Sequence, residues 1–104
     1  MAWLLIALAG VLEVVWAILL KTASPAHPVR LVAMIAAMIA SFVLLGRGMR
    51  DLPVGTAYAV WTGIGGAGTA IVGILWLGEP VSLGRIGALA LIVAGIVGLR
   101  VATP

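Results

Sequence analysis

The chain has 104 residues, of which 64% are hydrophobic and 9% are charged, and its formal net charge is +3. A soluble domain has about 25% charged residues, and six basic and three acidic side chains are too few to cover a water-soluble core. Disorder is excluded too, because disordered chains combine low hydrophobicity with high charge density. The absence of cysteine excludes disulfides and thiolate metal sites. The composition therefore indicates an integral membrane protein.

Four apolar runs follow one another along the chain. A membrane-spanning helix uses about 20 residues, so a chain of this length holds four spans with short connections. The runs predict spans at about residues 2–20, 29–46, 54–77 and 83–101. We therefore expect an all-α integral membrane protein, with residues 1–104 forming a single four-helix transmembrane domain.

Polar turn residues separate the spans. Pro25 and Pro28 prevent the first helix from continuing into the second. Asp51 is expected to cap the third helix, with Pro53 in its first turn, and Ser82 to cap the fourth.

The basic residues divide evenly between the two sides of the membrane. One side would hold Lys21, Arg30 and Arg85, and the other Arg47, Arg50 and Arg100. An excess of Lys and Arg normally sets the orientation of a membrane protein. Equal numbers therefore predict insertion in both orientations and an antiparallel homodimer in the lipid bilayer. The alternative is a weak bias that still selects one orientation.

Glu13 lies in the middle of the first span, where a carboxylate costs several kcal/mol. No Lys or Arg lies at a matching depth. One interpretation is a neutral glutamic acid that hydrogen-bonds a neighbouring helix. We favour a functional role, in which the carboxyl group exchanges a proton for a cation.

The residues on the same helix face as Glu13 support a binding site. Positions three and four apart share a face, which places Gly10 and Trp16 beside Glu13. Gly10 permits close approach of another helix or a ligand, and Trp16 offers an indole N–H. A tryptophan by itself is more typical of packing.

Further polar side chains lie in the second and third spans. Tyr58, Trp61 and Thr62 share one face of the third span, and the N–H of Trp61 needs a partner near mid-depth. Ser41 either bonds back to its own helix or donates to Glu13.

Small residues characterise the last two spans. Gly63 and Gly65 indicate either a bending point in the third helix or close packing. The fourth span carries no acid and is interpreted as a dimerisation arm. Its small residues are Gly87, Ala90, Ala94, Gly95 and Gly98.

The remaining charged residues receive structural interpretations, with Glu79 as a turn residue and Lys21 and Arg85 as anchors to lipid headgroups. The sequence has no metal-ligand cluster, phosphate loop or nucleophile–base pair. We therefore expect no enzyme, no metal and no bound cofactor, with protons as the only coupling ion, and no nucleic-acid partner.

Two segments together resemble the small multidrug resistance family, specifically its guanidinium exporter branch. Residues 10–21 read GVLEVVWAILLK, and residues 52–65 read LPVGTAYAVWTGIG. In the drug-exporting branch, the positions of Trp16 and Ala17 usually carry small or hydroxyl residues, and the position of Thr56 is usually apolar. The resemblance covers the whole chain.

The resemblance implies an antiparallel dimer in which two copies of Glu13 share one binding site. Residues that match Trp16, Ser41 and Trp61 hydrogen-bond the glutamates in that branch. The residue that matches Tyr58 is associated with switching the site between the two membrane faces. The glycines that match Gly63 and Gly65 mark the helix kink.

The implied function is proton-coupled antiport that exports guanidinium and related small substituted cations across the bacterial inner membrane. Three alternatives belong to other classes. The first is a broader exporter of drugs and quaternary ammonium cations, although Trp16 narrows the site against bulky substrates. The second is a dual-topology ion channel, and the third is a heterodimer subunit or structural membrane partner.

Overall fold

The computed structural model describes residues 1–104 and is all-helical apart from its connections. Its four helices are α1 (Ala2–Leu20), α2 (Pro28–Gly48), α3 (Val54–Trp76) and α4 (Leu83–Ala102). All four are long and apolar enough to cross a membrane. This confirms the prediction of an all-α protein with four helices of membrane-spanning length and composition.

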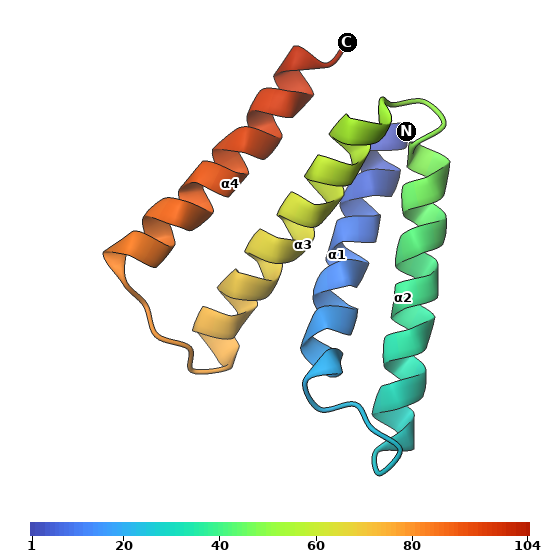
Figure 1. Cartoon of the computed structure of the whole chain (residues 1–104), viewed down its shortest axis with the longest axis vertical. Helices are drawn as coiled ribbons and strands as arrows, with labels where there is room; N and C mark the ends of the chain where they lie inside the picture. The colour runs from blue at the N-terminus through green and yellow to red at the C-terminus, as the bar shows by residue number, and fades with distance from the viewer.

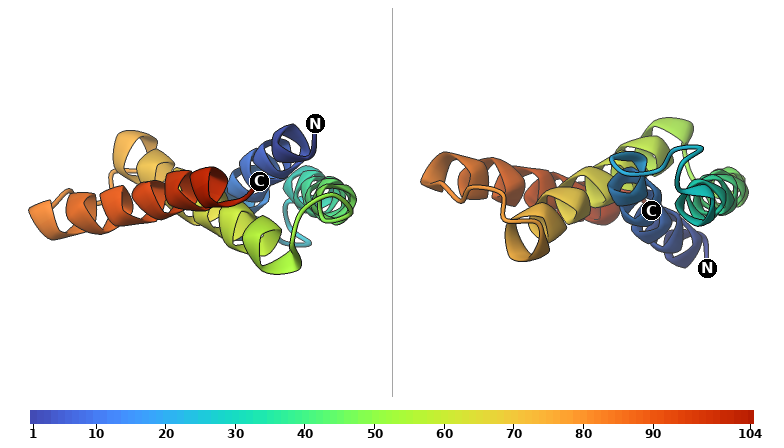
Figure 2. Two further views of the ribbon diagram at one scale, coloured as in Figure 1. Left: turned by 90° about the horizontal axis from the view of Figure 1, so that it is seen from above. Right: turned by 90° about the horizontal axis from the view of Figure 1, so that it is seen from below.

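The helices form a thin layer of 46 × 35 × 16 Å. Helix α1 packs against both α2 and α3, whereas α4 packs mainly against α3 and reaches α1 through Arg100, whose guanidinium carbon lies 4.8 Å from the centre of the Trp3 ring. Figure 1 shows α4 at one edge of the layer, diverging from α3 toward the loop that joins them. The views along the layer in Figure 2 show α4 crossing α3 at an angle. The site-bearing helices are therefore α1, α2 and α3, and α4 is an outlying arm.

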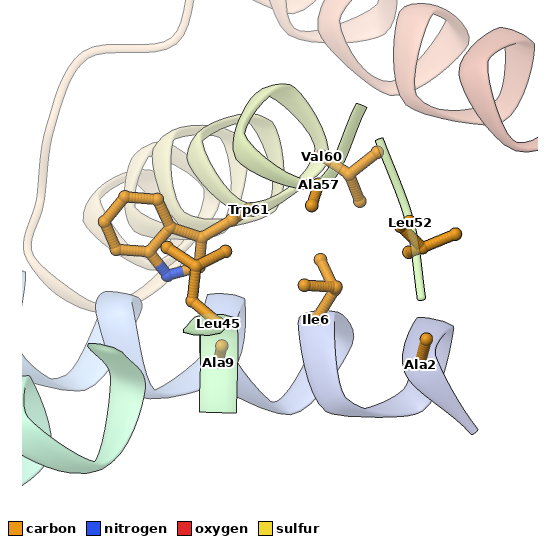
Figure 3. Close-up of a cluster of buried hydrophobic side chains, with 8 residues drawn as sticks. All are labelled: Ala2, Ile6, Ala9, Leu45, Leu52, Ala57, Val60 and Trp61. Carbon is orange, nitrogen blue, oxygen red and sulfur yellow. The ribbon is translucent and has the colours of Figure 1, made fainter. Parts of the chain in front are cut away.

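A small apolar cluster holds α1, α2 and α3 together. Figure 3 shows Ile6 and Ala9 of α1 facing Val60 and Trp61 of α3, with Leu45 of α2 beside them. The structure buries only 16 of its 104 residues, and none of them lies in α4. Apolar side chains of membrane helices can face lipid, so helix contacts depend on close packing of small residues.

Of the two predicted helix caps, the structure confirms Ser82 and contradicts Asp51. The hydroxyl of Ser82 accepts a hydrogen bond from the backbone N–H of Arg85 at 3.1 Å, as predicted. The prediction for Asp51 is wrong, because Pro53 is itself the N-cap of α3 and no side chain caps that helix. The N–H of Asp51 instead donates to the carbonyl of Gly48 in the turn that follows α2.

Three helices differ by one or two residues from the predicted ranges, and one of them, α4, ends at Ala102 instead of residue 101. Helix α2 begins at Pro28 and continues to Gly48, because proline is tolerated in the first turn, where its missing N–H has no role. Helix α3 ends at Trp76, one residue before the predicted end.

Candidate substrate and proton site

Glu13 lies half-buried on α1, with its carboxyl group against the backbone of α3. A Cβ atom on Gly65 would overlap the Glu13 carboxyl group, so only glycine leaves room for it. One turn earlier, a Cβ on Gly10 would lie 2.6 Å from Cγ2 of Ile64. Helices α1 and α3 therefore approach closely at Glu13 and one turn before it, because each helix carries a glycine at the contact.

Two buried polar atoms on α1 have no hydrogen-bond partner. They are Oε2 of Glu13 and Nε1 of Trp16, which come from residues three apart on α1. Buried polar groups in proteins are nearly always paired. An unpaired acceptor and an unpaired donor on the same helix face indicate a site that is completed by another group.

Ser41 and Trp61 form a separate hydrogen-bonded chain. The hydroxyl of Ser41 donates to the carbonyl of Ala9 at 2.7 Å, and Nε1 of Trp61 donates to the Ser41 hydroxyl at 3.0 Å. Neither residue bonds Glu13, so the hydrogen bonds that the resemblance implied are not made. Both alternatives for Ser41 were wrong, because its hydroxyl lies opposite the α1 backbone one turn before Glu13.

Four aromatic rings pack against one another next to the hydrogen-bonded pair of Ser41 and Trp61. Phe42 lies between Trp16 and Trp61, with ring centroids at 6.4 and 5.7 Å, and the ring of Tyr58 is 5.4 Å from that of Trp61. Phe42 is not among the predicted site residues, although it is the only phenylalanine and directly follows Ser41. The rings of four residues from three helices thus form one aromatic group beside the site.

The other predicted residues have contacts of a different kind. The hydroxyl of Thr62 donates to the carbonyls of Tyr58 and Ala59 at 2.9 and 3.1 Å, within its own helix. A Cβ on Gly63 would lie 2.9 Å from Cδ1 of Ile96, so this glycine brings α4 close to α3. Helix α3 is continuous through Gly63 and Gly65. Close packing thus explains both glycines, and bending at this point stays a prediction.

A cavity of about 390 Å³ extends from Glu13 to the loop between α3 and α4. Thr69 lines its middle, and the charged side chains at its outer end are Lys21, Glu79 and Arg85. From the sequence, Glu79 was interpreted as a turn residue and Lys21 and Arg85 as anchors to lipid headgroups. That interpretation was incomplete for Glu79 and Arg85, which pair with each other at 3.3 Å and line the cavity. No group of three or more His, Cys, Asp or Glu side chains comes together as a metal site.

The geometry can be compared with known proteins. A family model described as Small Multidrug Resistance protein matches residues 1–92. The chain belongs to the small multidrug resistance family. It is therefore a multi-pass membrane protein of a transporter family, and the expectation that it is not an enzyme is confirmed.

Relatives in this family resemble the chain over its whole length. It is 56% identical to the guanidinium exporter of Citrobacter freundii over 104 residues, which cover 99% of both chains. It is 53% identical to the guanidinium exporter of Yersinia pestis, covering 99% of this chain and 100% of the relative. Identity to the guanidinium exporter of Escherichia coli K12 is 52%, covering 99% of both. These relatives match the branch of the small multidrug resistance family that the two sequence motifs indicated.

Helix α4 of this small multidrug resistance protein leaves its small residues uncovered. A Cβ on Gly87, Gly95 or Gly98 would meet nothing within 4 Å, and Ala90 and Ala94 are exposed. The side of α4 that contacts α3 is formed instead by residues such as Ile92 and Ile96.

Proposed function

We propose that this chain is a proton-coupled antiporter that exports guanidinium and related small substituted cations across the bacterial inner membrane. The observation that carries the proposal is that two buried polar atoms from residues three apart on α1, Oε2 of Glu13 and Nε1 of Trp16, have no hydrogen-bond partner within a helix long and apolar enough to span a membrane. The relatives named guanidinium exporters support the substrate class.

The chemistry of the site suits a flat cation. Guanidinium presents several N–H donors in one plane, which match the two oxygens of a carboxylate. We propose that the ring of Trp16, three residues from Glu13 on the same helix, adds a cation–π contact. The N–H of Trp16 is a donor and cannot bond a cation, so its role is to orient a Glu13 carboxylate.

Proton coupling follows from competition for one group. A proton and a guanidinium cation both neutralise the Glu13 carboxylate, and they exclude each other from it. A carrier with bare carboxylates changes faces poorly, because moving unneutralised charge through low dielectric is costly. Protons that enter on one side therefore drive the cation out on the other.

The proposed active unit is an antiparallel homodimer with two copies of Glu13 at a shared site. The even division of basic residues supports insertion in both orientations. The uncovered small-residue face of α4 supports pairing of two copies. Reporters that are active on one membrane side only, fused to the C-terminus, should give signals from both sides. A signal from one side alone would contradict dual topology.

The antiport itself is tested in proteoliposomes. Glu13→Gln should abolish guanidinium uptake driven by an outward proton gradient, and Asp51→Asn is the matched control because Asp51 lies in an exposed loop. Guanidinium binding to the unmodified protein in weak buffer should release protons, and its apparent affinity should weaken as the pH falls. Coupled transport by Glu13→Gln would refute the role of Glu13, and flux independent of protons would favour a channel.

A further inference from the structure

The loop between α3 and α4 holds an arginine guanidinium group on a glutamate carboxylate. Nη2 of Arg85 lies 3.3 Å from Oε1 of Glu79, and Nη1 of Arg85 donates to the carbonyl of Pro80 at 3.0 Å. The backbone N–H of Arg85 donates to the Ser82 hydroxyl at 3.1 Å. The guanidinium group is therefore positioned by bonds within the loop and the first turn of α4.

The Glu79 carboxylate is held against α3 by two glycines. Gly78 has a φ of +69°, which lets the chain turn back, and the N–H of Glu79 donates to the carbonyl of Gly73 at 3.0 Å. A Cβ on Gly73 would overlap Oε1 of Glu79 and lie 3.1 Å from Oε2. The carboxylate thus occupies the space beside Gly73 that the Cβ atom of any other residue would fill.

Helix α3 therefore has two glycines that each leave room for a carboxylate. Gly65 receives the carboxyl group of Glu13, and Gly73, eight residues later, receives that of Glu79. Eight residues span about 12 Å along a helix. Thr69 lies halfway and donates to the carbonyl of Gly65 at 2.6 Å, which leaves its oxygen free to accept. The cavity contains both carboxylates and Thr69.

We infer that Glu79 is an outer binding site for the transported cation, and that the Arg85 guanidinium occupies it until a cation displaces it. The inference rests on the proposed function, because it takes guanidinium as substrate. The Arg85 side chain ends in a substituted guanidinium group, so a carboxylate that accepts its N–H groups also accepts those of the free ion. The pair acts as an internal competitor at the mouth of the Glu13 cavity.

The charges around the mouth make displacement necessary. Lys21 also lines the cavity, so this end of it carries two positive groups and one carboxylate, that of Glu79. A cation is stabilised there only when it takes the place of Arg85. The side chains of Arg85 and Glu79 are 38% and 41% exposed, and ion pairs with that much water contact are weak enough to exchange.

The test compares the two partners of the ion pair. KM for guanidinium is measured by counterflow in proteoliposomes. Glu79→Gln should raise KM, and Arg85→Gln should lower it, each by about two- to fivefold, the range of a partly exposed ion pair. A purely structural ion pair would move KM in the same direction for both variants, and that outcome, or no change in either, would overturn the inference.

Further variants distinguish an effect on the outer binding site from a loss of folding. Gly73→Ala should raise KM as Glu79→Gln does, because the methyl group displaces the carboxylate, and Gly46→Ala is the control because its Cβ would meet nothing within 4 Å. Arg85→Lys replaces Arg85→Gln if the latter does not reach the membrane, with a decrease in KM expected because an ammonium group lacks the planar pair of donors.

The outcome is separable from that of the proposed function. Proton release on guanidinium binding reports on Glu13 and should persist in Glu79→Gln. If the unmodified protein neither binds nor exchanges guanidinium, the proposed function fails. If it does both and the two variants shift KM alike, only the outer site is wrong.

Discussion

The indole N–H of Trp61 donates to the hydroxyl of Ser41 at 3.0 Å, and this hydroxyl donates in turn to the carbonyl of Ala9 at 2.7 Å. One serine thereby connects α3, α2 and α1. This series of two hydrogen bonds ends at Ala9, one turn before Glu13 on α1. It therefore sets the relative positions of the helices that surround the Glu13 carboxyl group. Ser41 and Trp61 act on the site through helix packing in this conformation.

Ser41→Ala should destabilise the protein. The variant leaves the buried N–H of Trp61 without an acceptor, which costs about 1 kcal/mol or somewhat more. It also removes the hydrogen bond that Ser41 donates to the carbonyl of Ala9. Thermal unfolding in detergent measures this loss of stability, with Ser24→Ala in the α1–α2 loop as control. Equal stability of Ser41→Ala and the unmodified protein would show that the two hydrogen bonds of Ser41 contribute nothing to the stability of the fold.

Trp16→Phe should reduce transport without reducing stability. The phenyl ring keeps the packing against Phe42, whereas the lost N–H has no partner within the chain. We expect KM for guanidinium to rise about five- to tenfold, which corresponds to loss of one hydrogen bond to a carboxylate. KM and the melting temperature are measured on the same preparation. A fall in melting temperature with unchanged KM would assign Trp16 to packing instead.

Gly65→Ala should abolish proton-coupled exchange. The added methyl group would occupy the position of the Glu13 carboxyl group and force either the side chain or α1 to move. Alanine also favours the helix relative to glycine, so we expect the helical content to be retained. Guanidinium-dependent proton release is the measurement, and Gly46→Ala is the control. Normal proton release by Gly65→Ala would mean that the Glu13 carboxyl group does not need the space beside Gly65.

Ala94→Leu should weaken dimer formation. Ala94 is exposed on the face of α4 that carries the small residues, and a larger side chain keeps two helices apart. Val93→Leu, on an adjacent face that lines an apolar groove with α3, is the matched control. Cross-linking in membranes compares the two variants. If the dimer fraction falls equally in both variants, the small-residue face of α4 is not the dimer interface.

The linear order of residues was sufficient to predict the spans and the central acid. Hydropathy is a property of consecutive residues, and the cost of a carboxylate in lipid depends on its distance from the ends of an apolar run. The Ser82 cap is also local, since its partner lies three residues away. The Asp51 cap failed because the register of a helix start depends on the adjoining turn.

Partners across helices could not be predicted in this way. Four apolar helices with one acid among them can be recognised from the residues alone, because hydrophobicity and charge act along the chain. The bond from Ser41 to Ala9, the place of Phe42 in the aromatic group and the pairing of Glu79 with Arg85 in the cavity of Glu13 follow from the packed helices. These contacts join residues from different helices and loops, so they depend on how the elements pack in three dimensions.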